Sequence, residues 1–175
     1  MKKLILFFDS GDTIIDQGTE VRLVPEGVVQ TAECIPGARE TVLHLHEAGY
    51  RICLVADGLA ESFRRMFDQQ GIAHCFEQRS VSETVGAEKP DARMFETAME
   101  LMSLTDADKK RVIMIGNNVE RDIAGANRFG IRSILLTWSP RYRMESRTAD
   151  ETPTWRVAEP KELWPLIEKI EAEIE

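Results

Sequence analysis

Short apolar runs alternate with amphipathic segments along the chain, and this alternation restricts the fold more than any other feature of the sequence. The apolar runs have the length of strands rather than of helices; they cover residues 4–8, 51–55, 76–80, 111–115 and 131–136, with a shorter candidate at 155–157. Between or after these runs, apolar residues recur with the spacing of a helix. These segments lie between residues 37 and 49, 59 and 71, 91 and 102, 123 and 130, and 163 and 170. Such alternation favours a parallel sheet with helices on both faces. The sequence therefore predicts a three-layer, Rossmann-like α/β fold.

The interval between the first strand and the first helix carries a different pattern. Residues 20–24 and 28–31 are strand-like and flank the turn sequence Pro25-Glu26-Gly27, which is typical of a hairpin. With 175 residues, the chain most simply forms one domain with a sizeable core. We therefore expect a single domain, 1–175, in which about residues 14–36 form a hairpin flap and no large cap domain is present.

Charge and cysteine content limit the partners of the chain. The formal net charge of −8 at pH 7 argues against broad binding to nucleic acid or to anionic membranes, but not against a small anionic substrate. Three cysteines without metal-ligand spacing, Cys34, Cys53 and Cys75, are typical of reduced thiols. The apolar start is too short for a signal peptide, and no stretch is long enough to cross a bilayer. We expect a cytoplasmic protein that binds neither nucleic acid nor membranes.

Polar segments lie at four strand ends, where open α/β sheets form their ligand crevices. The first is Asp9-Ser10-Gly11-Asp12-Thr13, and the others are residues 56–58, 86–91 and 116–122. A carboxylate such as Asp9 after a buried strand can act as a nucleophile or hold a hard cation. The simpler interpretation of the first segment alone is an acidic turn, but four such segments together favour a functional site.

The order and spacing of these segments resembles the haloacid dehalogenase superfamily of hydrolases, most of which are phosphatases. The resemblance covers nearly the whole chain. Its most specific parts are Lys89-Pro90-Asp91 with Phe95 behind it, and the run GNNVERDIAGA at residues 116–126.

Carried over to this sequence, the resemblance implies that Asp9 is the nucleophile, forms an aspartyl-phosphate and ligates Mg²⁺. The backbone carbonyl of Gly11 would be a second ligand, Asp122 would support the metal, and Thr13 would close the loop. An anionic nucleophile that attacks an anionic phosphoryl group needs positive charge to screen it. Lys89 and Mg²⁺ would supply that charge.

The sequence departs from the family pattern at three of the four segments. Phosphatases of the family place a general acid and base two residues after the nucleophile, where this chain has Gly11, and an acid appears one residue later as Asp12. A shift of one residue turns a side chain to the opposite face of an extended segment. Asp12 is therefore either a displaced acid/base group, which would make it catalytic with Asp9 and Lys89, or a turn-forming residue.

At the second segment, Ala56 replaces the phosphate-binding Ser or Thr, and Asp57 follows it. With Lys89, these two residues occupy the phosphate-binding positions, although Asp57 also suits a loop or helix-capping role. At the fourth segment, Asn117 replaces the Asp that ligates the metal directly. Because an amide keeps an oxygen but loses a charge, we expect a weakened Mg²⁺ site at Asp9, Gly11, Asn117 and Asp122.

Three hypotheses for the function remain, in the following order. The first is a Mg²⁺-dependent phosphohydrolase that acts, weakly, on a small phosphorylated compound. The second is a catalytically impaired protein that binds a phosphorylated ligand or a protein partner. The third is metal-free dehalogenase-like chemistry, but relatives of that kind use an arginine and cap residues. Because capless relatives commonly use a neighbouring subunit to cover the site, a homo-oligomer is a further expectation.

Residues 138–147 form a basic stretch in an otherwise acidic chain, with Arg141, Arg143 and Arg147. In one interpretation this stretch contacts an anionic substrate or a partner subunit. In the other it is an irregular solvated loop.

Overall fold

The computed structural model describes residues 2–174 and contains one six-stranded parallel sheet with the strand order β5-β4-β1-β6-β7-β8. The strands are β1 (Ile5–Phe8), β4 (Arg51–Ala56), β5 (Gln78–Val81), β6 (Val112–Gly116), β7 (Arg132–Leu136) and β8 (Trp155–Val157). The helices are α1 (Ala38–Glu47), α2 (Ala60–Gln69), α3 (Ser82–Val85), α4 (Ala92–Leu101), α5 (Ala124–Phe129) and α6 (Leu163–Glu173). The predicted α/β fold is confirmed, and the triplet at 155–157 is its sixth strand.

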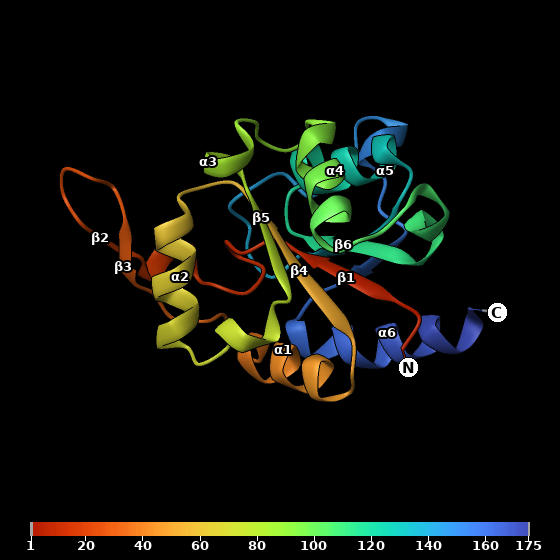
Figure 1. Ribbon diagram of the computed structural model, residues 1–175, viewed down its shortest axis with the longest axis horizontal. Coiled ribbons are helices and arrows are strands. Elements are labelled where there is room, and N and C mark those ends of the chain that lie inside the picture. The colour runs from red at the N-terminus through yellow and green to blue at the C-terminus, as the bar shows by residue number, and fades with distance from the viewer. Residues whose placement is uncertain (1, 175) are drawn as a thin grey trace.

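Helices cover both faces of the sheet, with α4 and α5 above it and α1 and α6 below it in Figure 1. The central strand β1 is buried throughout and sends alternate side chains to the two faces. Leu6 and Phe8 pack into the core on the side of α1, α2 and α6, whereas Ile5 and Phe7 pack against α4 and α5. Burial on both faces explains why this run is continuously apolar.

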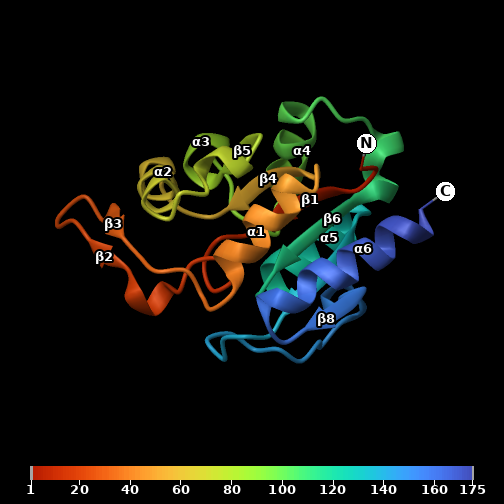
Figure 2. The same cartoon turned by 90° about the horizontal axis from the view of Figure 1, so that it is seen from below.

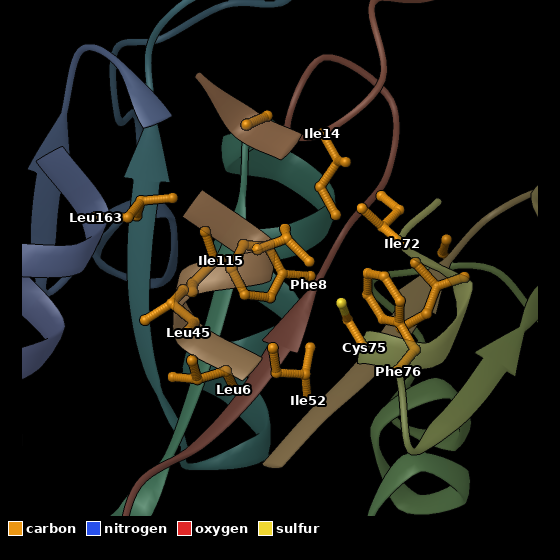
Figure 3. Close-up of a cluster of buried hydrophobic side chains, with 14 of the residues drawn as sticks. Leu6, Phe8, Ile14, Leu45, Ile52, Ile72, Cys75, Phe76, Ile115 and Leu163 are labelled. Atoms are coloured by element: carbon orange, nitrogen blue, oxygen red, sulfur yellow. The ribbon is translucent and has the colours of Figure 1, made fainter. Parts of the chain in front are cut away.

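Figure 3 draws some of the side chains of the larger core cluster. There, Leu6 and Phe8 of β1 and Ile115 of β6 meet Leu45 of α1 and Leu163 at the start of α6. In Figure 2, α1 and α6 run along the same side of the sheet. Together with α2, these two helices cover this face of the sheet.

The predicted hairpin is also confirmed, and it stands outside the main sheet beyond α2 (Figure 1). Its strands, β2 (Val21–Arg22) and β3 (Val29–Thr31), are antiparallel. Two side chains of α2 hold it: Ser62 Oγ accepts from the backbone N–H of Val29 at 2.9 Å, and Gln69 Oε1 accepts from that of Ala32 at 3.0 Å. The hairpin is thus fixed by hydrogen bonds to a helix rather than by sheet pairing.

Short elements were not predicted. The helix α3 has four residues and ends at Gly86, whose φ is 74°; it is too short to show a 3.6-residue period. The fourth polar segment begins with a π-helical turn, Val119–Ile123, before α5. No helix among residues 2–174 has the length and apolar composition needed to span a bilayer. The three cysteines of this part of the chain are free thiols, as expected.

Candidate active site

The adjacent strands β4, β1 and β6 bring Asp57, Asp9 and Asn117 together at one edge of the sheet. Each of the three residues follows the carboxyl end of its strand directly. A pocket of about 370 Å³ lies there; it is lined by Asp9, Gly11, Gln17, Asp57, Lys89, Asn117, Asn118, Arg121, Asp122 and Tyr142. The sequence-predicted residues Asp9, Gly11, Asp57, Lys89, Asn117 and Asp122 therefore share one pocket.

Lys89 joins two carboxylates within this pocket. Its Nζ lies 2.7 Å from Asp9 Oδ1 and 2.7 Å from Asp122 Oδ1, and it donates to the carbonyl of Val55 at 2.7 Å. The side chain is only 2% exposed. Burial alone would lower the pKa of Lys89, but the carboxylates of Asp122 and Asp9 raise it above its usual range. Lys89 is therefore an ammonium at neutral pH.

Asp122 is positioned by the backbone of its own motif. Its Oδ2 accepts from the N–H groups of Asn117 and Asn118, both at 3.1 Å. A β-carbon at Gly116 would lie 2.3 Å from that oxygen, so only glycine leaves room for the carboxylate. Burial and the charge of Asp9 raise the pKa of Asp122 above its usual range, although Lys89 opposes them. The sequence Gly116-Asn117-Asn118 therefore fixes the position of the Asp122 carboxylate.

Asp57 organises the loop that carries Lys89. Its Oδ1 accepts from the backbone N–H of Lys89 at 2.9 Å, and its Oδ2 pairs with Arg121 at 3.3 Å. These contacts agree with the loop role considered for Asp57. Neither this carboxylate nor the buried methyl group of Ala56 offers a donor to a phosphate, so their predicted phosphate-binding positions are left without a side-chain donor. Lys89 and Arg121 are the cations that line the pocket.

Asp12 lies apart from this group. Its side chain is 0% exposed, its Oδ1 accepts from the N–H of Gln17 at 3.0 Å, and its Oδ2 pairs with Arg141. Asp12 has a φ of 50°, in the left-handed region that Asp tolerates better than most residues. The burial of the carboxylate, its pair with Arg141 and the positive φ favour the turn-forming interpretation of Asp12 over the acid/base one.

Four pocket residues had not been singled out from the sequence, and one of them, Tyr142, lies in the basic stretch at 138–147. Arg121 and Asn118 lie inside the predicted fourth segment, so the signal was present. Gln17 opens a short 3₁₀ helix, Gln17–Thr19, whose N-cap is Asp16, and nothing in its local sequence points to a site. Only the folding of this turn over Gly11 brings Gln17 beside Asp9.

The basic stretch at 138–147 is bound to the core through its arginines. Arg141 pairs with Asp12, and Arg143 pairs with Glu151 at 2.8 Å and with Glu120 at 3.0 Å. Tyr142 lies between them and lines the pocket. The stretch is therefore an irregular, largely exposed loop, as in the second interpretation, but the side chains of Arg141 and Arg143 tie it to the rest of the protein.

The donor set of the pocket suits a hard cation only in part. Among residues 2–174, no three carboxylate, imidazole or thiol side chains gather as a metal centre requires. Asp9 and Asp122 are joined instead by Asn117, which is 1% exposed and whose Nδ2 has no hydrogen-bond partner in this part of the chain. The side-chain oxygen of Asn117 and the carboxylates of Asp9 and Asp122 are ligand types that Mg²⁺ accepts, whereas the unpartnered Nδ2 is a hydrogen-bond donor and cannot bind a cation.

Comparison with known proteins agrees with this geometry. The family model for haloacid dehalogenase-like hydrolases matches residues 3–130. The glyceraldehyde 3-phosphate phosphatases of Methanothermobacter thermautotrophicus and Methanopyrus kandleri are 31% and 27% identical over 73% and 77% of this chain. The pyrimidine 5′-nucleotidase YjjG of Escherichia coli is 28% identical over 76% of it. The chain spans 57%, 57% and 56% of these relatives, respectively.

Solved structures show the same fold. The putative HAD-hydrolase YfnB of Bacillus subtilis, bound to magnesium, aligns with a TM-score of 0.75 over 95% of this chain and 99% of that one, at 16% identity. The HAD phosphatase of Thermococcus onnurineus aligns with a TM-score of 0.73 over 94% and 97%, at 14% identity. The family match, together with the four polar segments at one edge of the sheet, identifies this chain as a member of the haloacid dehalogenase-like hydrolases.

Proposed function

We propose that this chain is a phosphohydrolase that takes the phosphoryl group of a small phosphorylated compound onto Asp9. The observation that carries the proposal is Lys89 Nζ, held 2.7 Å from a carboxylate at the end of the central strand and 2.7 Å from a second, buried one. The named activities of the relatives support it, although the chain spans little more than half of their length.

The contacts of Asp9 suggest which of its oxygens attacks. Oδ1 is held by the ammonium of Lys89, whereas Oδ2 has only a long contact, 3.4 Å, from the hydroxyl of Thr13. Oδ2 is therefore the freer nucleophile. It would form a bond to phosphorus while the bond from phosphorus to the leaving oxygen breaks. Lys89 and Arg121 would screen the charge that the attack brings together, and water would then release phosphate from the aspartyl-phosphate.

Mg²⁺ is the proposed cofactor. Asp9, the carbonyl of Gly11 and Asn117 would hold it, and Asp122 would support it. When bound, it would add positive charge beside the phosphoryl group. The pocket has three carboxylates, Asp9, Asp57 and Asp122, but only two cationic side chains line it. The protein alone therefore does not supply the positive charge that a phosphoryl group would need.

A second candidate function is a binding or regulatory protein with impaired catalysis. One observation favours it: the carboxylate of Asp12 is in the core, paired with Arg141, and does not reach the pocket. The loss of a placed acid lowers a rate by about 10²–10⁴-fold, which leaves a slow enzyme rather than none.

The test is Asp9→Asn, with phosphate release measured from a panel of phosphate esters in the presence of Mg²⁺. We expect a loss on the order of 10⁴–10⁶-fold, as when other covalent nucleophiles are removed, with the fold unchanged by circular dichroism. The matched control is Asp106→Asn, because the side chain of Asp106 is 92% exposed and lies outside the pocket. Equal rates for wild type and Asp9→Asn would exclude the aspartyl-phosphate mechanism.

A further inference from the structure

A second pocket adjoins the active-site pocket and lies between the hairpin and α2. Its volume is about 460 Å³, and the two pockets are continuous because Gly11, Gln17 and Asp57 line both. Asp9 and Lys89 line the first pocket and not the second. An in-line displacement places the leaving oxygen on the side of phosphorus away from the attacking carboxylate. The second pocket, called the side compartment below, is therefore a space into which a leaving group can extend.

Part of the lining of the side compartment is apolar. It consists of Val29 from the hairpin, Leu59 at the N-cap of α2, and Phe63 and Met66 within that helix. A β-carbon at Gly58 would lie 3.0 Å from Cζ of Phe63, so the aromatic ring packs against the backbone that follows Asp57 directly. The glycine thus allows an aromatic ring to lie next to the pocket that would hold the phosphoryl group.

Hydrogen bonds between the hairpin and α2 fix the shape of the side compartment. Ser62 Oγ accepts from the backbone N–H of Val29 at 2.9 Å. The backbone N–H of Ala32 donates to Gln69 Oε1 at 3.0 Å, and its carbonyl accepts from Gln70 Nε2 at 2.7 Å. A preformed pocket loses little binding energy to the ordering of its walls.

Most of the remaining side chains that line the side compartment are polar. Glu20 and Arg22 pair with each other, and Asp57 pairs with Arg121. Ser10 is 1% exposed, and its Oγ has no hydrogen-bond partner among residues 2–174, so this hydroxyl is available to a bound molecule. An anionic leaving group would meet two carboxylates and a cation that is already paired. The lining therefore suits an uncharged group.

We propose that the side compartment binds the leaving group and selects phosphate esters of uncharged alcohols that carry a flat ring. This inference rests on the proposed attack by Asp9. A flat ring can pack against Phe63 and Met66, and Ser10 can bond to a polar group at the edge of the ring. A short chain leaves the apolar lining in contact with water, and a carboxylate is repelled by Glu20 and Asp57.

The experiment compares benzyl phosphate, ethyl phosphate and 4-carboxybenzyl phosphate, three esters of primary alcohols in which the leaving oxygen has similar basicity. Phosphate release by wild type with Mg²⁺ gives kcat/KM for each. We expect the value for benzyl phosphate to exceed that for ethyl phosphate at least about tenfold, and that for 4-carboxybenzyl phosphate at least about tenfold as well. Equality of benzyl phosphate with either of the other two would overturn the inference while leaving the proposed function intact.

Leu59→Ser tests the apolar lining. It removes an apolar side chain from the side compartment and places a preferred N-cap residue at the start of α2, so the helix is not weakened. We expect the ratio of kcat/KM for benzyl phosphate to that for ethyl phosphate to fall by roughly tenfold. The matched control is Leu101→Ser, because Leu101 is 41% exposed and does not line the side compartment; its ratio should equal that of wild type. An unchanged ratio in Leu59→Ser would contradict the inference.

A titration without turnover separates the inference from the proposed function. Benzylphosphonate and ethylphosphonate, which cannot be hydrolysed, are titrated into wild type with Mg²⁺ by calorimetry. We expect benzylphosphonate to bind at least about tenfold more tightly. If no ester releases phosphate, the proposed function fails, and the titration still decides the inference: tighter binding of benzylphosphonate supports it, whereas equal affinities, or no binding of either compound, overturn it.

Discussion

At the scale of single residues, the proposed cation site depends most on Asn117. Its side chain is buried at the end of β6, next to two carboxylates that share one ammonium. An aspartate here would add the charge that a hard cation prefers but would also add repulsion to Asp9 and Asp122 when no cation is bound. If the proposed site binds Mg²⁺, Asn117 would give a lower affinity than an aspartate but less repulsion between carboxylates when no cation is bound.

Asn117→Asp should tighten Mg²⁺ binding by at least about tenfold, or about 1.4 kcal/mol. Titration calorimetry measures the affinity, and thermal unfolding should show a lower melting temperature than wild type without Mg²⁺ and a larger upward shift with it. The control is Asn118→Asp, because Asn118 Oδ1 caps the N–H groups of Glu120 and Arg121 and an aspartate can keep that role. An equal gain in both variants would mean that Asn117 acts by charge alone and is not a ligand.

At the scale of elements, the sequence was sufficient to predict the features that depend on the spacing of apolar residues and on the polar residues at strand ends. β1 is apolar at every position because both of its faces are covered, and Asp9 follows it at the edge where β4 and β6 end as well. The sequence left the role of Asp12 open, because a shift of one residue can reverse the direction of a side chain. Asp12 looks like a displaced catalytic acid in the sequence, but its direction depends on a positive φ and on Arg141, which lies 129 residues away.

The tethered segment at 138–147 depends on Glu151, whose carboxylate accepts from Arg143 and from the backbone N–H of Arg147. The side chain of Arg143, followed by the Arg147 N–H, lowers the pKa of Glu151 from 4.5 to about 2. A group with a depressed pKa in the folded state stabilises it above the unfolded-state pKa, and loses this effect as the pH falls through the folded-state value.

Glu151→Gln should therefore have a lower free energy of unfolding than wild type at pH 7, and the difference should shrink as the pH falls from 4.5 toward about 2. Urea titrations at a series of pH values measure this difference. Glu145→Gln, at an exposed glutamate of the same segment, is the control and should show little effect at any pH. A Glu151→Gln deficit that stays constant between pH 7 and the acid range would contradict the ion pair.

At the scale of the whole molecule, we expect the central sheet to contribute much more to stability than the hairpin does. Leu6 is 0% exposed in the central strand, which pairs with β4 on one side and β6 on the other. The hairpin, in contrast, stands apart from the sheet, and Val24 at its tip is 89% exposed. We therefore expect core and flap to respond very differently to the loss of methyl groups.

Leu6→Ala should lower the free energy of unfolding by about 2–5 kcal/mol, because the site cannot collapse around the cavity. Val24→Ala should change it by less than about 0.5 kcal/mol. Denaturant titration followed by tryptophan fluorescence and by circular dichroism measures both values. Similar losses in the two variants would contradict a hairpin tip that contributes little to the core.

The pair between Asp12 and Arg141 has a consequence for the order in which the protein is made. Every polar segment of the pocket lies within the first 122 residues, but the cation that neutralises the buried Asp12 comes 129 residues after it. A nascent chain that has emerged only as far as α5 contains the complete set of strand ends and still carries an unmatched acid beneath its active-site turn. We therefore expect the turn that contains Gln17 to become stable during synthesis only after the segment containing Arg141 has left the exit tunnel.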